Sequence, residues 1–111
     1  MPFTTSKSGS VLIVQPEGQV NSSNAAAFEA DLLVELDKGE QRIVLDLARL
    51  DYISSAGLRV ILLLAKKLKQ AGGALALCAI QPNVREVLEI SGFLSILKVY
   101  DQKSEAVAAL E

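Results

Sequence analysis

The chain has 111 residues, a formal net charge of −2 and a hydrophobic content of 50%. This length corresponds to one domain, residues 1–111, and the apolar content argues against intrinsic disorder. The acidic balance argues against nucleic acid as a partner, because nucleic-acid-binding domains present a basic face. No apolar run approaches the ~20 residues of a membrane span, and residues 1–10 do not resemble a signal peptide. We therefore expect a cytoplasmic protein that does not bind a membrane.

The sequence contains no histidine and a single cysteine, Cys78. The missing histidine removes the Ser-His-Asp triad and every His-ligated metal site. Cys78 lies in the apolar run Ala74–Ile80, so we expect it to pack in the core. Asp46 and Asp51 flank a turn but have no other catalytic group beside them, and no Gly-rich phosphate loop is present. The sequence predicts a binding module, not an enzyme, and we expect no cofactor or metal.

Predicted strands and helices alternate along the chain. The expected strands are Pro2–Lys7, Val11–Val14 with a continuation at Gly18–Val20, Arg42–Leu47, Ala74–Ile80 and Ile96–Tyr100. The expected helices run from Asn21–Asn24 to Lys38, over Ala56–Gln70, from Pro82 to Gly92, and over Glu105–Leu110 with Ser104 as the cap. This alternation predicts an α/β domain with a mixed sheet of about five strands and about four helices.

The stretch Asp46–Leu64 predicts the end of a strand, a short turn and the start of a helix. Ser54 and Ser55 stand directly ahead of Ala56–Gly57, at the expected helix N-terminus. A serine hydroxyl at this position accepts a hydrogen bond from a free backbone N–H, and the positive end of the helix dipole also tolerates a phosphate. The two hydroxyls therefore form either an ordinary cap or a modification site.

The first half of that helix is unusually apolar, with Arg59 as the one charged residue in Ala56–Ala65. A helix that is apolar nearly all round is covered on more than one side. One cover is the sheet, and the other is either a neighbouring helix or a docked partner. The polar cluster Asn21–Asn24 predicts a helix start, with a binding role as the alternative.

Four segments of the chain resemble segments of a known protein family. The run Val44–Leu64, VLDLARLDYISSAGLRVILLL, resembles the STAS domain of bacterial anti-sigma factor antagonists. Gly18–Asn21, followed by an Ala-rich helix, is similar to the Gly-x-x-Asp turn of that family. Gly73–Pro82 resembles its fourth strand, and Val84–Leu97 resembles its third helix and last strand. The segments occur in the family's order and cover about residues 10–110.

The resemblance implies a regulatory function by partner switching. In the family, a serine at the N-terminus of the second helix is exposed, and an anti-sigma factor that is also a GHKL-type Ser kinase binds there. The kinase phosphorylates the serine and then releases the domain, and a PP2C-type phosphatase reverses the mark. Unphosphorylated antagonist sequesters the anti-sigma factor and frees sigma. The resemblance therefore implies a partner face made of Asn21, Ser22, Ser23, Asn24, Ser54, Ser55, Ala56, Gly57 and Arg59.

This sequence departs from the common family motif, Asp-Ser-Ser-Gly-Leu, whose second serine is phosphorylated. Aligned on Gly57-Leu58, Ala56 falls at the usual acceptor and Ser54 at the Asp. Asn21 stands where the family often has Asp. Because we expect Ser55 to be the helix cap, Ser54 is the favoured phosphoacceptor and Ser55 the alternative. A second interpretation is a STAS scaffold or sensor-interaction module that is not phosphorylated.

Overall fold

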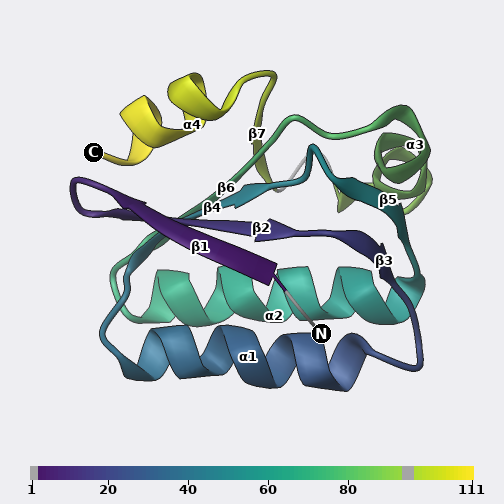
Figure 1. Ribbon diagram of the computed structural model, residues 1–111, viewed down its shortest axis with the longest axis horizontal. Helices are drawn as coiled ribbons and strands as arrows, with labels where there is room; N and C mark the ends of the chain where they lie inside the picture. The colour runs from purple at the N-terminus through teal and green to yellow at the C-terminus, as the bar shows by residue number, and fades with distance from the viewer. Residues whose placement is uncertain (1–2, 94–96) are drawn as a thin grey trace.

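The computed structural model describes residues 3–93 and 97–111 and shows one central sheet with helices on both faces (Figure 1). The sheet consists of β1 (Phe3–Ser8), β2 (Val11–Pro16), β4 (Arg42–Asp46), β6 (Ala74–Cys78) and β7 (Lys98–Tyr100). These strands are adjacent in this order; β1 pairs antiparallel with β2 and the other pairs are parallel. The expected mixed five-stranded sheet is confirmed. Pro2 and Ile96, at the ends of two predicted strands, lie outside the described residues.

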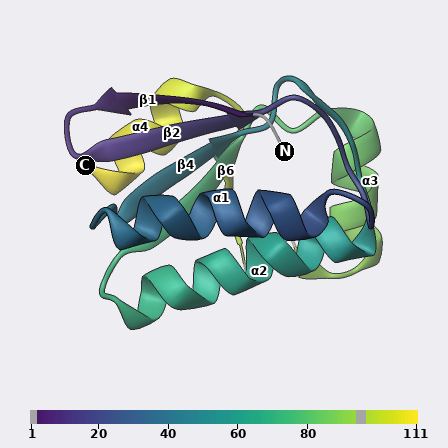
Figure 2. The same ribbon diagram turned by 60° about the horizontal axis from the view of Figure 1, so that its bottom comes forward.

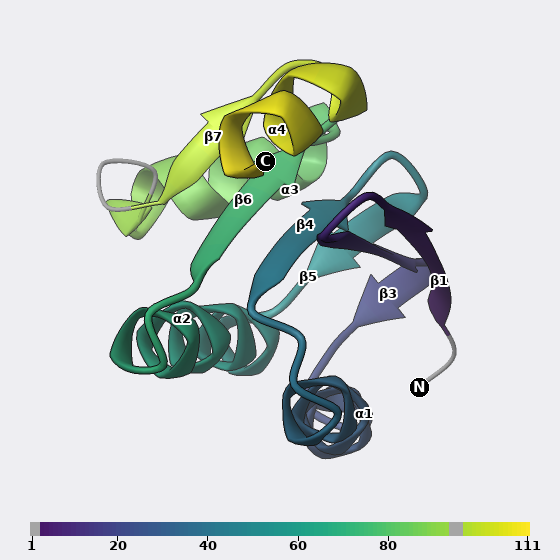
Figure 3. The same cartoon turned by 90° about the vertical axis from the view of Figure 1, so that its left-hand side faces the viewer.

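Two layers of helices cover this sheet. Helices α1 (Ala25–Asp37) and α2 (Ser55–Gln70) lie side by side beneath one face (Figure 2), and α4 (Lys103–Leu110) lies on the other (Figure 3). The covered central strand β4 is buried from Ile43 onward, as is typical of parallel strands between helical layers. No helix in the described part of the chain is both long and apolar enough to cross a membrane.

The third helix, α3 (Pro82–Ile90), begins at the proline that the sequence suggested and is followed by Gly92 in the left-handed conformation. The fourth helix differs from its prediction in its start. It begins at Lys103, and the backbone N–H of Gln102 donates to the carboxylate of Glu105 at 3.1 Å. Ser104 therefore lies in the first turn and is not the N-cap residue, because the glutamate supplies the acceptor at this end.

A second, two-stranded sheet pairs β3 (Gly18–Val20) with β5 (Leu50–Ile53). The sequence pattern predicts only a turn where β5 lies and a continuation of β2 where β3 lies. Both expectations are wrong. Strand β5 has only four residues, of which Leu50 and Ile53 are buried and Asp51 and Tyr52 are exposed, so it carries too little alternation to be recognised. Strand β3 pairs parallel with β5, outside the main sheet.

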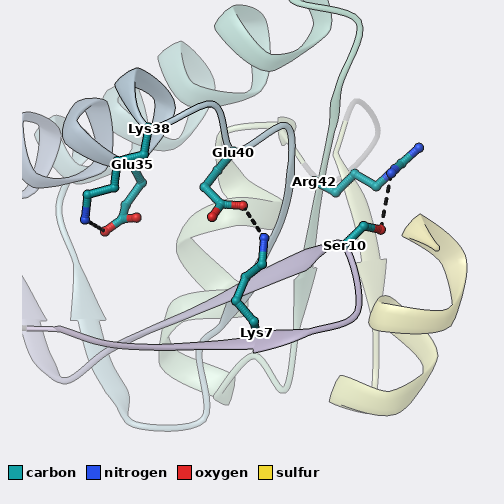
Figure 4. A network of polar contacts seen from close by, with 6 residues as sticks. All are labelled: Lys7, Ser10, Glu35, Lys38, Glu40 and Arg42. Carbon is teal, nitrogen blue, oxygen red and sulfur yellow. Dashed lines mark hydrogen bonds and ion pairs between the residues drawn. The ribbon is translucent and has the colours of Figure 1, made fainter.

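Exposed polar contacts join β1 to the segment between α1 and β4, and the β1–β2 turn to the first residue of β4 (Figure 4). The Nζ atom of Lys7 lies 2.6 Å from Oε1 of Glu40, and Nη1 of Arg42 lies 3.2 Å from the Ser10 hydroxyl. Solvent-exposed pairs of this kind each stabilise a fold by less than about 1 kcal/mol. These contacts lie at the C-terminal end of α1, opposite the end where the candidate partner face is formed.

Candidate functional site

The two-stranded sheet brings the two predicted binding segments together. Strand β3 leads into residues 21–24 and α1, and β5 leads into Ser54 and α2. Because the strands are parallel and Val20 pairs with Ile53, both helices begin at the same edge of the molecule (Figure 1). The backbone N–H of Ser54 donates to the carbonyl of Val20 at 2.8 Å, which joins the two segments directly. Segments about 30 residues apart in the sequence thus form one surface.

The N-terminus of α2 reverses the expected roles of the two serines. Ser54 is the N-cap residue, with an extended backbone, and its hydroxyl accepts a hydrogen bond from the backbone N–H of Gly57 at 3.3 Å. Ser55 is the first residue of the helix, and its side chain is exposed and makes no hydrogen bond within the described part of the chain. The expectation that Ser55 is the cap is therefore wrong. The helix start itself, expected within two residues of Ala56, is confirmed.

The remaining α2 residues of the predicted face differ in their exposure. Arg59 is exposed and has no ion pair among the described residues. Ala56 is half-buried and packs against the core, whereas Gly57 is buried. A Cβ atom on Gly57 would lie 2.7 Å from Cγ1 of Ile53 and 2.8 Å from Cγ1 of Val20, so the glycine permits close packing of α2 on the small sheet. Gly57 therefore lies beneath the surface, and its close packing sets the positions of the exposed residues Ser55 and Arg59 on α2.

Residues 21–24 form a hydrogen-bonded loop instead of a side-chain cap. The Asn24 side chain accepts from the backbone N–H of Asn21 at 2.8 Å and donates to the carbonyl of Gln19 at 2.9 Å. The Asn21 side chain accepts from both the N–H and the hydroxyl of Ser23, at 2.9 and 2.6 Å. The predicted helix start is confirmed at Ala25, but Asn24, the N-cap residue, makes no side-chain cap bond. Ser22 and Ser23 are exposed on this ordered loop.

The electrostatic character of the surface favours an anion. Neither α1 nor α2 has an acidic residue in its first turn, so the positive ends of both helix dipoles are uncompensated there. Arg59 adds a full positive charge one turn into α2. Tyr52, which the sequence patterns did not single out, is 45% exposed on β5 beside Gln19 of β3. With β5 recognised as a strand, alternation from the buried Ile53 places its neighbour Tyr52 on the outward face.

The apolar first half of α2 is covered by α1 as well as by the sheet. The two helices lie side by side (Figure 2). Val60 and Leu64 of α2 line the seam between them together with Leu32 of α1. The sequence left open whether a neighbouring helix or a docked partner packs on this part of α2, and the neighbouring helix is confirmed. The exposed part of the candidate partner face is therefore limited to the helix N-termini and the residues just after them.

Two of the groups considered for catalysis, Cys78 and Asp46, are buried in this fold. Cys78 is fully buried, as expected, and burial, with a smaller effect from the charge of Asp46, raises the pKa of its thiol to about 11. The Asp46 carboxylate is 5% exposed and accepts from the Gln15 side chain at 3.0 Å and from the backbone N–H of Ala48 at 3.1 Å. Within residues 3–93 and 97–111, no cluster of three or more His, Cys, Asp or Glu residues could hold a metal ion.

Residues 3–106 match the family model of the STAS domain. The chain belongs to the STAS family. The family match covers both helix N-termini of the partner face and the whole of the mixed sheet, as the four sequence segments had indicated.

Relatives of this STAS domain are named as regulators of sigma factors. BtrV of Bordetella bronchiseptica, a candidate anti-sigma factor antagonist, is 56% identical over 111 residues, which is 100% of this chain and 96% of BtrV. The anti-sigma F factor antagonist of Paenibacillus polymyxa is 35% identical over 103 residues, which is 91% of this chain and 87% of the Paenibacillus protein. The crystal structure of a candidate anti-sigma factor antagonist from Thermotoga maritima superposes with a TM-score of 0.92 at 32% identity, covering 97% and 93% of the two chains.

Proposed function

We propose that this STAS domain is an anti-sigma factor antagonist that works by partner switching and is controlled by phosphorylation of Ser55. The single observation that carries the choice of residue is the hydrogen bond from the Gly57 N–H to the Ser54 hydroxyl, which leaves Ser55 as the exposed serine of this turn. Names of close relatives support the antagonist role. The proposed partners are an anti-sigma factor with GHKL-type Ser kinase activity and a PP2C-type phosphatase.

The site favours phosphate on Ser55 without loss of the fold. A phosphate adds about −1.5 to −2 charges at neutral pH, and at a helix N-terminus the dipole and free N–H groups stabilise it. The absence of acidic residues from the first turns of α1 and α2 removes a source of repulsion. The bound kinase, in contrast, must accommodate the phosphate on a surface shaped for a neutral hydroxyl. A penalty of about 3 kcal/mol weakens binding on the order of 100-fold, which is enough to exchange partners.

Mass spectrometry of the chain after incubation with ATP and the candidate GHKL-type kinase encoded nearest to it tests this function. We expect one phosphate on wild-type protein and on Ser54→Ala, and none on Ser55→Ala. Ser23→Ala is the matched control, because Ser23 is also an exposed serine on the partner face. Phosphorylation of Ser55→Ala on Ser54 would contradict the assignment of the acceptor.

One observation favours a second candidate function, a STAS scaffold that is not phosphorylated. Ala56 occupies the usual acceptor position of the motif and is half-buried, so the standard acceptor is missing. Calorimetry with the same kinase separates the two functions. Tight binding without any phosphate transfer identifies a scaffold, whereas binding that weakens on the order of 100-fold after phosphorylation identifies the switch.

A further inference from the structure

A cavity of about 490 Å³ opens between the C-terminal half of α2 and the starts of β6 and β7, away from the partner face. Its lining begins at Leu62, seven residues after Ser55, which places it roughly 10 Å farther along the helix axis. The volume lies within the range of about 300–1,000 Å³ that is typical of small-molecule sites. No function assigned above to this chain uses it.

Much of the described lining of the cavity is aliphatic. It includes Leu62 and Ala65 of α2, Leu75 of β6, and Leu97 just before β7. Leu62 and Ala65 both remain partly exposed, and both line the cavity. The lining described contains no aromatic ring and no amide or hydroxyl side chain. Such a surface favours an alkyl chain over a nucleobase or sugar, which need stacking or hydrogen-bonding partners.

Three lysines also line the cavity, Lys66 and Lys69 from α2 and Lys98 from β7. All three are exposed, and none has an ion pair within the described residues. Lys66 and Lys69 are three residues apart and therefore project from one face of the helix. The lining described includes no carboxylate, although the whole chain is acidic with a net charge of −2. The local excess of positive charge selects an anionic group at the mouth of the cavity.

We propose that this cavity binds one alkyl chain that carries an anionic headgroup. The chain lies on Leu62, Ala65 and Leu75, and the headgroup lies among the lysines. A free fatty acid and an anionic phospholipid share this chemistry. Occupancy is independent of the serines at the other end of α2, so the proposal goes beyond the switch function.

Titration of the full chain with sodium decanoate, below its micellar concentration, tests the proposal by calorimetry and by amide chemical shifts. We expect saturable binding of one decanoate, with shifts confined to residues around 62–75 and 97–98. Hexanoate should bind at least tenfold more weakly, because it buries fewer methylene groups. Decyltrimethylammonium, which has the same chain and the opposite charge, should not bind. If decyltrimethylammonium binds as tightly as decanoate does, the proposal is overturned.

Variants separate the headgroup from the chain. Lys66→Glu and Lys69→Glu should each weaken decanoate binding about five- to tenfold, since each reverses the sign of one exposed contact. Lys67→Glu is the matched control, because Lys67 is also exposed on α2 but is not among the residues lining the cavity. Ala65→Phe, which fills the cavity, should abolish binding. Unchanged binding by either lysine variant or by Ala65→Phe in folded protein would overturn the proposal.

Sedimentation with phosphatidylglycerol vesicles distinguishes the two sources of the ligand. Vesicle binding that is lost in Lys66→Glu identifies a lipid, and decanoate binding without vesicle binding identifies a free acid; both support the proposal. Failure of both probes overturns it. Ser54→Ala and Ser55→Ala should bind decanoate as wild type does, so the outcome does not depend on the switch.

Discussion

The hydroxyl of Ser54 accepts a hydrogen bond from the backbone N–H of Gly57 at 3.3 Å, and this bond separates the roles of two adjacent serines. Ser54 satisfies one of the free N–H groups of the first turn of α2. Ser55, one residue later, presents its hydroxyl to solvent. One serine therefore caps the helix, and the other has an exposed side chain that could take the proposed phosphate.

Replacement of the two serines should affect stability unequally. Ser54→Ala should lower the free energy of unfolding by about 1 kcal/mol, because the cap bond is lost. Ser55→Ala should change it by less than about 0.5 kcal/mol, since an exposed side chain without a partner is removed. Urea denaturation followed by circular dichroism measures both values. Equal losses, or a larger loss for Ser55→Ala, would contradict the cap assignment.

Gly57→Ala should destabilise the domain by about 1–3 kcal/mol, as expected for overpacking. The new methyl group would lie 2.7 Å from the Ile53 side chain and 2.8 Å from the Val20 side chain, so α2 must move away from the small sheet. Double-mutant analysis with Val20→Ala provides the control. The pair should cost less than the sum of the single changes, because Val20→Ala removes one of the clashing groups. Strict additivity would show that the clash is not the cause.

Arg59→Glu should weaken binding of the proposed anti-sigma factor kinase at least tenfold, because it reverses the charge of an exposed residue on the proposed partner face. Arg59 is exposed and has no ion pair within the described residues, so the melting temperature should stay nearly unchanged. Calorimetric binding and thermal melting are measured on the same samples. Lys67→Glu, an equivalent charge reversal farther along α2, is the control. Equal binding by both variants would place the partner elsewhere.

The buried thiol of Cys78 should make stability depend on alkaline pH. Burial, followed by the charge of Asp46, raises the pKa in the folded state to about 11 from the reference value of 9.0. Below pH 9 the thiol is protonated in both the folded and the unfolded state, so the free energy of unfolding keeps its full value. Between about pH 9 and 11 only the unfolded state loses the proton, and the free energy of unfolding should fall by about 1.4 kcal/mol per pH unit.

Comparison with Cys78→Ala isolates this contribution from other groups that titrate in alkali. The variant is expected to be less stable at neutral pH, because a buried sulfur atom is removed. Its stability should nevertheless fall less steeply between pH 9 and 11 than that of wild type. Parallel curves from urea titrations across this range would show that the thiol does not titrate differently in the two states.

The helices and strands with strong local sequence patterns could be located from the sequence alone. The apolar run in Arg42–Leu47 predicted a strand, and Ile43–Leu45 of β4 are fully buried. The pattern of Asp46–Leu64 predicted the start of α2, and Pro82 and Gly92 marked the ends of α3. The missing histidine and the apolar surroundings of Cys78 pointed away from catalysis, and the family resemblance was recognisable from four short segments.

Which segments lie together, and which serine makes the cap hydrogen bond, depends on tertiary contacts. Strand β5 has four residues, and its pairing with β3 is stabilised by contacts between positions about 30 residues apart, which no local pattern encodes. That pairing, together with the packing of Gly57 on Val20 and Ile53, sets where α2 begins and which hydroxyl faces its free N–H groups. Either serine has the chemistry of a cap, so the choice between them depends on backbone geometry that tertiary contacts impose.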